Sequence, residues 1–217
     1  MTREEIAAAA AALDEAERTR TQIGLLSLAH QDMTMDDAYA VQATWVEKKI
    51  SAGRRVIGRK IGLTSKAMQA ALSIDTPDSG ILFDDMLFDN DAAIPRDRFI
   101  QPRIEAEIAF VMKADLKGDV SVDDVLDATD FVQPSLEILD TRILRADPET
   151  GKTRNVCDTI ADNAANAGIV LGGERIAPRA VDLRWVGAIV MKNGEVEETG
   201  LGGLPRVGDG ANADHPA

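Results

Sequence analysis

Apolar residues recur at helical spacing in the first quarter of the chain. A capping-box pattern, in which Thr2 precedes Glu5, and the alanine run that follows predict a helix over residues 2–20. A second helix is predicted from Thr34, which can cap it, to Gly53, which can end it. The pattern therefore indicates a helical segment ahead of the first strand.

From about residue 55 the spacing changes towards the two-residue period of β-strands. A hairpin is predicted at residues 181–200, because Asn193 and Gly194 match a tight primed turn. The order of the elements, helices first and then mostly strands, predicts an α+β fold. The other expected elements are short helices at 65–74, 121–130 and 158–168, and strands at 55–61, 80–83, 99–112, 131–143 and 169–173.

The chain is expected to have three parts. An N-terminal helical segment, residues 1–54, precedes a β-rich catalytic domain, residues 55–199. Residues 200–217 are rich in Gly, Pro, Asp and Ala and have no apolar period, so we expect this tail to be disordered.

The composition limits the partners and the compartment. The chain has 217 residues and a net charge of −13, so neither nucleic acid nor an anionic membrane is an expected partner. It has no apolar run long enough for a transmembrane helix, and its start lacks the uncharged core of a signal peptide. Its one cysteine, Cys157, excludes an internal disulfide and reads as a small buried hydrophobe. We therefore expect a cytoplasmic protein.

Two glutamates lie two positions apart in the predicted strand at 99–112. Glu105 and Glu107 share a face of that strand with Arg103, and the two carboxylates lie about 7 Å apart along it. Their repulsion is roughly 2 kcal/mol, and a hard divalent cation such as Mg²⁺ or Mn²⁺ would remove it. A solvated sheet face is the alternative. Glu137 lies in another predicted strand, so three carboxylates converge if the two strands are neighbours.

Two further residues are candidates for acid/base chemistry. Lys60 lies near a strand end, where it is either a solvated edge residue or an acid/base in a closed pocket. Asp78 lies in a predicted turn, where it either hydrogen-bonds the backbone or acts as a base. The only histidines, His30 and His215, lie in weakly structured contexts and argue against a catalytic triad or a zinc site. Two tryptophans, at positions 45 and 185, are expected in the core.

Six segments of the chain resemble, in the same order, the hydratase/decarboxylase branch of the fumarylacetoacetate hydrolase superfamily. The resemblance implies a mixed β-roll with an N-terminal helical segment, assembled as a homo-oligomer of the kind that forms pentamers of dimers. It implies that Glu105, Glu107 and Glu137 bind Mg²⁺ or Mn²⁺ and that Lys60 and Asp78 do acid/base work. The segments are GRKIGLTSKAMQ, PDSGILFDDM, QPRIEAEIAF, PSLEILDTRI, DTIADNAANAGIVLGG and LRWVGAIVMKNGEVEETG.

The resemblance also implies an activity. It implies metal-dependent hydration of 2-oxo-hept-4-ene-1,7-dioate, through its dienol, to 4-hydroxy-2-oxoheptanedioate in aromatic catabolism. The alternatives are hydration of 2-hydroxypenta-2,4-dienoate, decarboxylation of 4-oxalocrotonate, and an inactive truncated subunit. The last arises because family members continue past the hairpin with further strands, which are expected to be missing here.

A basic segment follows the strand that carries Glu137. A seven-carbon diacid has a second carboxylate that a cation should receive. Either these residues bind it, or they form a solvated loop on an acidic surface. They are Arg142, Arg145, Lys152 and Arg154.

Overall fold

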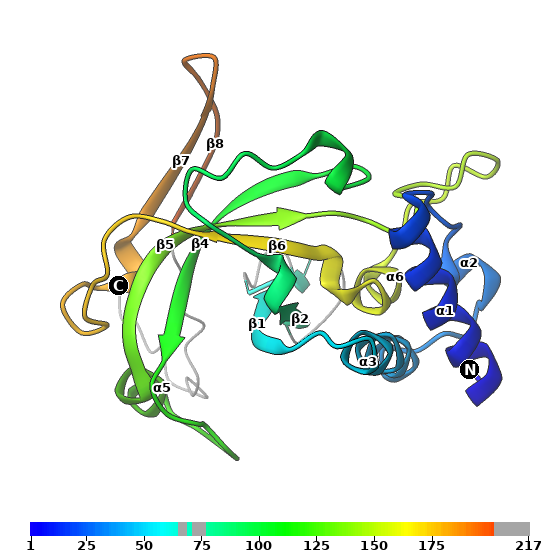
Figure 1. Cartoon of the computed structure of the whole chain (residues 1–217), viewed down its shortest axis with the longest axis horizontal. Coiled ribbons are helices and arrows are strands. Elements are labelled where there is room, and N and C mark those ends of the chain that lie inside the picture. The colour runs from blue at the N-terminus through cyan, green and yellow to red at the C-terminus, as the bar shows by residue number, and fades with distance from the viewer. Residues whose placement is uncertain (65–68, 71–76, 202–217) are drawn as a thin grey trace, which may run out of the picture. The chain divides into compact units, whose positions relative to one another are not determined.

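The computed structural model describes residues 1–64, 69–70 and 77–201 (Figure 1). Most of the predicted helix at 65–74 and of the predicted tail therefore lies outside the described residues. The α-helices are α1 (Arg3–Thr19), α2 (Leu26–Ala29), α3 (Met35–Ser51), α5 (Val122–Ala128) and α6 (Val156–Ala161). The strands are β1 (Val56–Gly62), β2 (Asp78–Phe83), β3 (Leu87–Phe88), β4 (Arg103–Met112), β5 (Thr129–Leu139), β6 (Asn166–Leu171), β7 (Gly187–Lys192) and β8 (Glu195–Leu201). Short 3₁₀ turns are η1 (Asp84–Met86), η2 (Arg96–Arg98), η3 (Asn163–Ala165) and η4 (Leu183–Trp185).

The chain packs into two compact units. The first comprises Met1–Glu107 and Ser135–Leu171. The second comprises Ile108–Pro134 and the described residues from Gly172 onward. Strands β4 and β5 each contribute residues to both units. The units describe packing alone, so the division of the chain at residues 54 and 199 stays a prediction.

Both long N-terminal helices begin at the capping threonines that the sequence predicts, and each has a capping box. The Thr2 side chain accepts from the Glu5 N–H at the start of α1, and Glu5 bonds back to the Thr2 backbone. Thr34 and Asp37 make the same reciprocal pair at the start of α3. Helix α3 packs against α1 and α6 (Figure 1), and its Trp45, 1% exposed, lies edge-on to Phe83 of β2 in the core.

Strands β1 and β2 form an antiparallel pair whose register places Lys60 opposite Gly80 and Gly62 opposite Asp78. A second sheet has the strand order β3-β6-β5-β4, with β3 parallel to β6 and β5 antiparallel to β6. The sheet is therefore mixed, as predicted, and β4 and β5 are the neighbours that convergence of the three glutamates requires.

Side-chain amides bind the edge of β2 that β1 leaves free. Asn163 accepts from the Ile81 N–H at 2.7 Å and donates to the Ile81 carbonyl at 2.9 Å. Gln42 of α3 donates to the Ser79 carbonyl, also at 2.9 Å. Asn163 reaches this position from a left-handed backbone conformation, φ 54°, one of three successive positive φ values. This clamp fixes the strand that begins with Asp78, since buried backbone groups need partners.

The second unit contains the predicted hairpin. Asn193 and Gly194 have φ values of 54° and 87° and join β7 to β8, as a primed turn requires. The expectation for Trp185 is wrong, because its side chain is 74% exposed. It belongs to η4, just before a two-stranded ribbon whose residues are almost all exposed, and such a ribbon cannot bury an indole.

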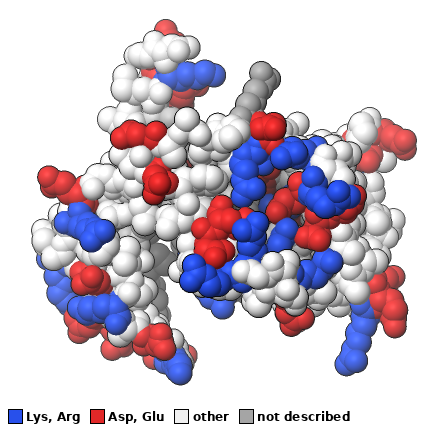
Figure 2. Space-filling model, viewed as in Figure 1, with Lys and Arg blue, Asp and Glu red and all other residues white. Residues whose placement is uncertain are grey.

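The surface charge is not gathered in one patch on the face that Figure 2 shows. Basic side chains there lie next to acidic ones, although the chain as a whole is acidic. Among the described residues, no helix combines the length and the apolarity that a membrane crossing needs.

Candidate metal centre

Three carboxylates from two neighbouring strands meet at one point. Glu105 and Glu107 lie on β4 and Glu137 lies on β5, and one oxygen from each is within 4.8 Å of the others. The two-residue spacing on β4 puts its two carboxylates on one face, and the hydrogen-bonded neighbour supplies the third. Glu137 is 6% exposed, whereas the other two are more open to solvent.

The donor set fits a divalent cation. At this separation each pair of negative charges repels by about 3 kcal/mol at an effective dielectric near 20. Among the described residues, the cluster's one ion pair with a basic side chain is that of 3.5 Å between the Lys60 Nζ and the Glu137 Oε2. The other oxygen of Glu137, Oε1, is buried with no hydrogen-bond partner among the described residues. Three carboxylates against one ammonium leave two negative charges, which one Mg²⁺ or Mn²⁺ would neutralise with its preferred oxygen ligands.

Burial and the repulsion between the carboxylates both raise pKa values in the cluster. Burial raises the pKa of Glu137 to about 7, the Lys60 charge opposes that rise, and the charges of Glu105 and Glu107 add to it. The pKa of Glu107 is also raised, first by desolvation and then by Glu105. A proton on Glu137 and a metal ion therefore compete for the same carboxylate.

Asp78 and Lys60 lie together beside the cluster. Asp78 is 2% exposed, and its Oδ1 is buried without a hydrogen-bond partner among the described side chains and backbone groups. Burial raises the pKa of Asp78, against the opposing charge of Lys60 and the Gly62 N–H. A buried carboxyl with a raised pKa beside an ammonium has the properties of an acid/base pair.

Gly62 makes this arrangement possible. A Cβ atom at position 62 would lie 2.4 Å from Asp78 Oδ1 and 3.1 Å from Lys60 Nζ. Sequence reasoning missed this residue, although a glycine two positions after a strand lysine is a signal of close approach.

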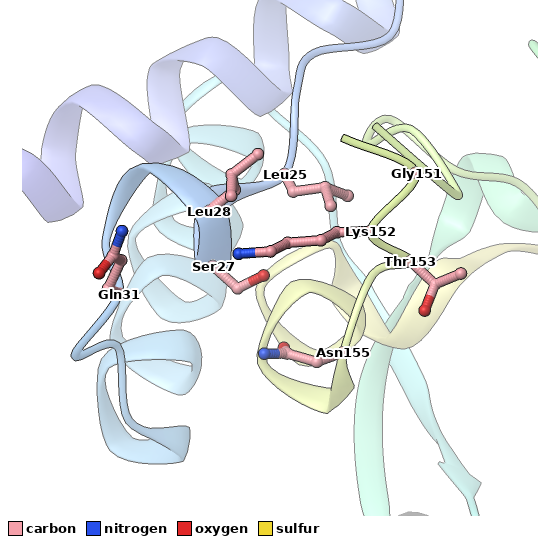
Figure 3. Close-up of a pocket in the computed structure, with 8 residues that line it drawn as sticks. All are labelled: Leu25, Ser27, Leu28, Gln31, Gly151, Lys152, Thr153 and Asn155. Carbon is pink, nitrogen blue, oxygen red and sulfur yellow. The ribbon is translucent and has the colours of Figure 1, made fainter. Parts of the chain in front are cut away.

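The four basic residues predicted to bind substrate separate into two groups. Arg142 is 2% exposed, pairs with the Asp162 carboxylate, donates to the Asp162 carbonyl and lies 5.4 Å from the Trp45 ring. These contacts favour a role in the core. Lys152 lines a pocket of about 470 Å³ with residues of α2, towards which its side chain extends (Figure 3). None of the three glutamates lines that pocket.

Arg145 and Arg154 lie together instead. The Arg154 N–H donates to the Arg145 carbonyl at 3.0 Å, and the Arg154 charge acts on Asp78. The structure therefore brings Lys60, Asp78, the three glutamates and these two arginines into one region of the first unit. Their functional roles stay predictions.

Together the fold and site define a class, that of α+β enzymes with a carboxylate site for a divalent metal. No family model matches the chain. It is 54% identical over 190 residues to 2-oxo-hept-4-ene-1,7-dioate hydratase of Escherichia coli. The aligned region covers 87% of this chain and 71% of that protein. It is 43% identical to 2-keto-4-pentenoate hydratase of Paraburkholderia xenovorans (strain LB400), over 93% of this chain and 73% of that protein.

A solved structure has a similar fold. It is 4-oxalocrotonate decarboxylase from Pseudomonas putida G7, complexed with calcium and acetate, with a TM-score of 0.83 and 35% identity over 93% of this chain and 74% of that one. A structure of that decarboxylase complexed with magnesium and adipate gives a TM-score of 0.80 over 93% of this chain and 75% of that one. The chain belongs to the hydratase/decarboxylase branch of the fumarylacetoacetate hydrolase superfamily.

Mg²⁺ affinity should rise as the pH increases through about 7, because Glu137 must lose its proton to act as a ligand. Isothermal titration calorimetry between about pH 5.5 and about pH 8 measures this dependence. The Glu137→Gln variant, which has no proton to lose at this position, should bind weakly with a flatter pH profile. An affinity of the unaltered protein that stays constant over this range would contradict the account.

The raised pKa of Glu137 also predicts how the stability of the metal-free fold changes with pH. Glu137 has a folded pKa of about 7 against an ordinary value of 4.5, so the metal-free folded state binds more protons than the unfolded state between these values. The stabilisation that Glu137 contributes is therefore present at low pH and lost as the pH rises through this window. Added Mg²⁺ should raise the melting temperature more at about pH 8 than at about pH 5.5.

Proposed function

We propose that the protein hydrates 2-oxo-hept-4-ene-1,7-dioate, through its dienol, to 4-hydroxy-2-oxoheptanedioate in the degradation of aromatic compounds such as homoprotocatechuate. The observation that carries the proposal is the convergence of Glu105, Glu107 and Glu137 beside the half-buried Lys60 and the buried Asp78. The identity to the Escherichia coli hydratase supports the choice of substrate.

The three glutamates would hold a divalent metal ion. When bound, such an ion supplies a Lewis acid for the carboxylate and adjacent 2-oxo oxygen of the substrate. The glutamates also make the empty site strongly negative, so an anionic substrate is accepted only once that charge is neutralised.

Lys60 and Asp78 would move the protons. Ketonisation of the dienol removes the proton of the 2-hydroxyl group and delivers one to carbon 5, which leaves a double bond between carbons 3 and 4. Water oxygen then adds to carbon 4, and carbon 3 takes a proton. The raised pKa of Asp78 makes its carboxyl a better proton carrier than an ordinary aspartate, and the neighbouring Lys60 charge stabilises its ionised form.

A second candidate is decarboxylation of 4-oxalocrotonate on the same site. The observation that favours it is the structural likeness to the decarboxylase from Pseudomonas putida G7. Hydration of 2-hydroxypenta-2,4-dienoate is the corresponding candidate for a five-carbon substrate, and the 43% identity to 2-keto-4-pentenoate hydratase supports it.

The finer architecture is also a proposal. We infer a mixed β-roll of the fumarylacetoacetate hydrolase type, a homo-oligomer and a cytoplasmic location. The mixed order of the second sheet and the TM-score of 0.83 to a superfamily member support the roll.

The test of the function is product analysis by NMR with purified protein and Mg²⁺. We expect 4-hydroxy-2-oxoheptanedioate to form, and chelation of the metal to abolish the reaction. Glu137→Gln should reduce kcat/KM by about 100-fold or more, because it removes a metal ligand, while Glu149→Gln, at an exposed position outside the site, should not. Release of carbon dioxide without hydration would identify a decarboxylase, and turnover that survives chelation would refute the metal site.

Substitution of Gly62 should damage proton transfer more than metal binding. In Gly62→Ala the new methyl group displaces the Asp78 carboxyl and Lys60, and we expect kcat to fall by about 100-fold. Mg²⁺ affinity, measured by calorimetry, should change little. Gly58→Ala on the same strand is the matched control, because its Cβ would meet Leu82 at an ordinary 3.6 Å. Full activity of the Gly62 variant would show that Asp78 and Lys60 do not need this placement.

A further inference from the structure

Three arginines that make no close ion pair among the described residues lie in the region of the carboxylate cluster. Among the described residues, the guanidinium groups of Arg103, Arg145 and Arg154 make no ion pair within 4.0 Å. Several other arginines of this acidic chain are paired, as Arg142 is with Asp162 and Arg179 is with Asp123. Three unpaired cations in one place therefore need an explanation in a protein with a net charge of −13.

Contacts with the backbone hold Arg145 and Arg154 together and tie Arg145 to the segment ahead of β4. The Ala146–Thr153 bridge closes a small loop whose two ends carry Arg145 and Arg154 side by side. From there the Arg145 Nη2 reaches the Gln101 carbonyl at 3.5 Å. The segment ahead of β4 is itself fixed, because the N–H groups of Ile100 and Gln101 both donate to the Asp140 carboxylate.

Arg103 extends this group towards the metal ligands. It is the first residue of β4 and shares its face with Glu105, the next residue on that side of the strand. Its charge acts on both Arg145 and Arg154. The arginine group is therefore continuous with the carboxylate cluster.

Without a bound anion, the placement of the three arginines is energetically unfavourable. The Arg154 Nη1 is buried and has no hydrogen-bond partner among the described residues. Burial is the first cause that lowers the pKa of Arg154 and the pKa of Arg145. The charge of Asp162 opposes this effect at both arginines, and the like charge of Arg103 adds to it. An anion placed among the three groups would supply the missing acceptors and remove the repulsion.

We propose that Arg103, Arg145 and Arg154 form the subsite for the second carboxylate of a dicarboxylic 2-oxo acid. The inference rests on the proposed function and names the residues that select a diacid over a monoacid. It assigns a binding role to Arg103, which the basic segment at 142–154 does not include.

The length of the substrate agrees with this placement. The two carboxyl carbons of an extended seven-carbon diacid lie about 7 to 8 Å apart from bond geometry. Residues of a strand that share a face and are two positions apart are separated by about 7 Å, which is the step from Glu105 to Arg103. The planar fork of a guanidinium binds both oxygens of a carboxylate, which a lysine cannot do.

The first test is binding without turnover. Calorimetry with Mg²⁺-loaded protein compares heptanedioate with heptanoate, which lacks the second carboxylate. The unaltered protein should bind the diacid at least about tenfold more tightly, and Arg154→Gln and Arg103→Gln should remove that preference. Arg154→Lys should recover it only in part. Arg3→Gln, at an exposed position on α1, is the control and should keep the full preference. Equal affinity of the unaltered protein for both acids would overturn the subsite, whatever reaction it catalyses.

The second test separates the two ends of the substrate. In the Arg154→Gln and Arg103→Gln variants, kcat/KM for the seven-carbon diacid should fall at least about tenfold, while that for 2-hydroxypenta-2,4-dienoate should not. An equal loss on both substrates would place the arginines at the first carboxylate and contradict the proposal. Normal diacid preference in binding with no hydration of any substrate would refute the proposed function and leave the subsite intact.

Melting temperatures distinguish a binding role of the three arginines from a purely structural one. If the three arginines stabilise the fold, Arg154→Gln should lower the melting temperature. The proposal expects an unchanged or higher melting temperature, because the substitution removes a buried unpaired charge. It also expects heptanedioate to stabilise the unaltered protein more than this variant.

Discussion

The structure depends on one electrostatic constraint, which is that three carboxylates are held within reach of one another against their repulsion. Strands β4 and β5 fix Glu105, Glu107 and Glu137 through backbone hydrogen bonds, and the ammonium of Lys60 offsets part of the negative charge. Burial first, and then the charges of Glu105 and Glu107, raise the pKa of Glu137 in the metal-free protein. A divalent cation resolves the constraint, and the site then accepts an anionic 2-oxo acid.

The rest of the first unit holds the acid/base groups against this cluster. Strand β1 pairs with one edge of β2, and buried amides from Gln42 and Asn163 hydrogen-bond the backbone on the other. Asp78 begins that strand, so the amide clamp and the space left by Gly62 together determine where its carboxyl lies. Side chains from the helical part of the chain thus help to position the Asp78 carboxyl, because they hydrogen-bond the short strand that begins with it.

Local rules were enough for part of this structure. The capping box at Thr2, the cap at Thr34, the turn at Asn193 and the shared face of Glu105 and Glu107 follow from spacing alone, and the structure confirms them. Long-range packing decided the rest. Spacing could not reveal that β4 and β5 are neighbours, that Arg142 forms an ion pair with Asp162 in the core, or that Arg103 lies near Arg154. Trp185 was misjudged because an apolar residue in a strand-like segment does not reveal whether a second layer covers it.

The central claim is that one divalent ion binds between the glutamates of β4 and β5. Anomalous diffraction from a crystal grown with excess Mn²⁺ tests it most directly. The account predicts a single strong peak within bonding distance, about 2.0 to 2.3 Å, of an oxygen from each of Glu105, Glu107 and Glu137. A peak elsewhere, or three well-ordered carboxylates with no peak between them, would contradict it.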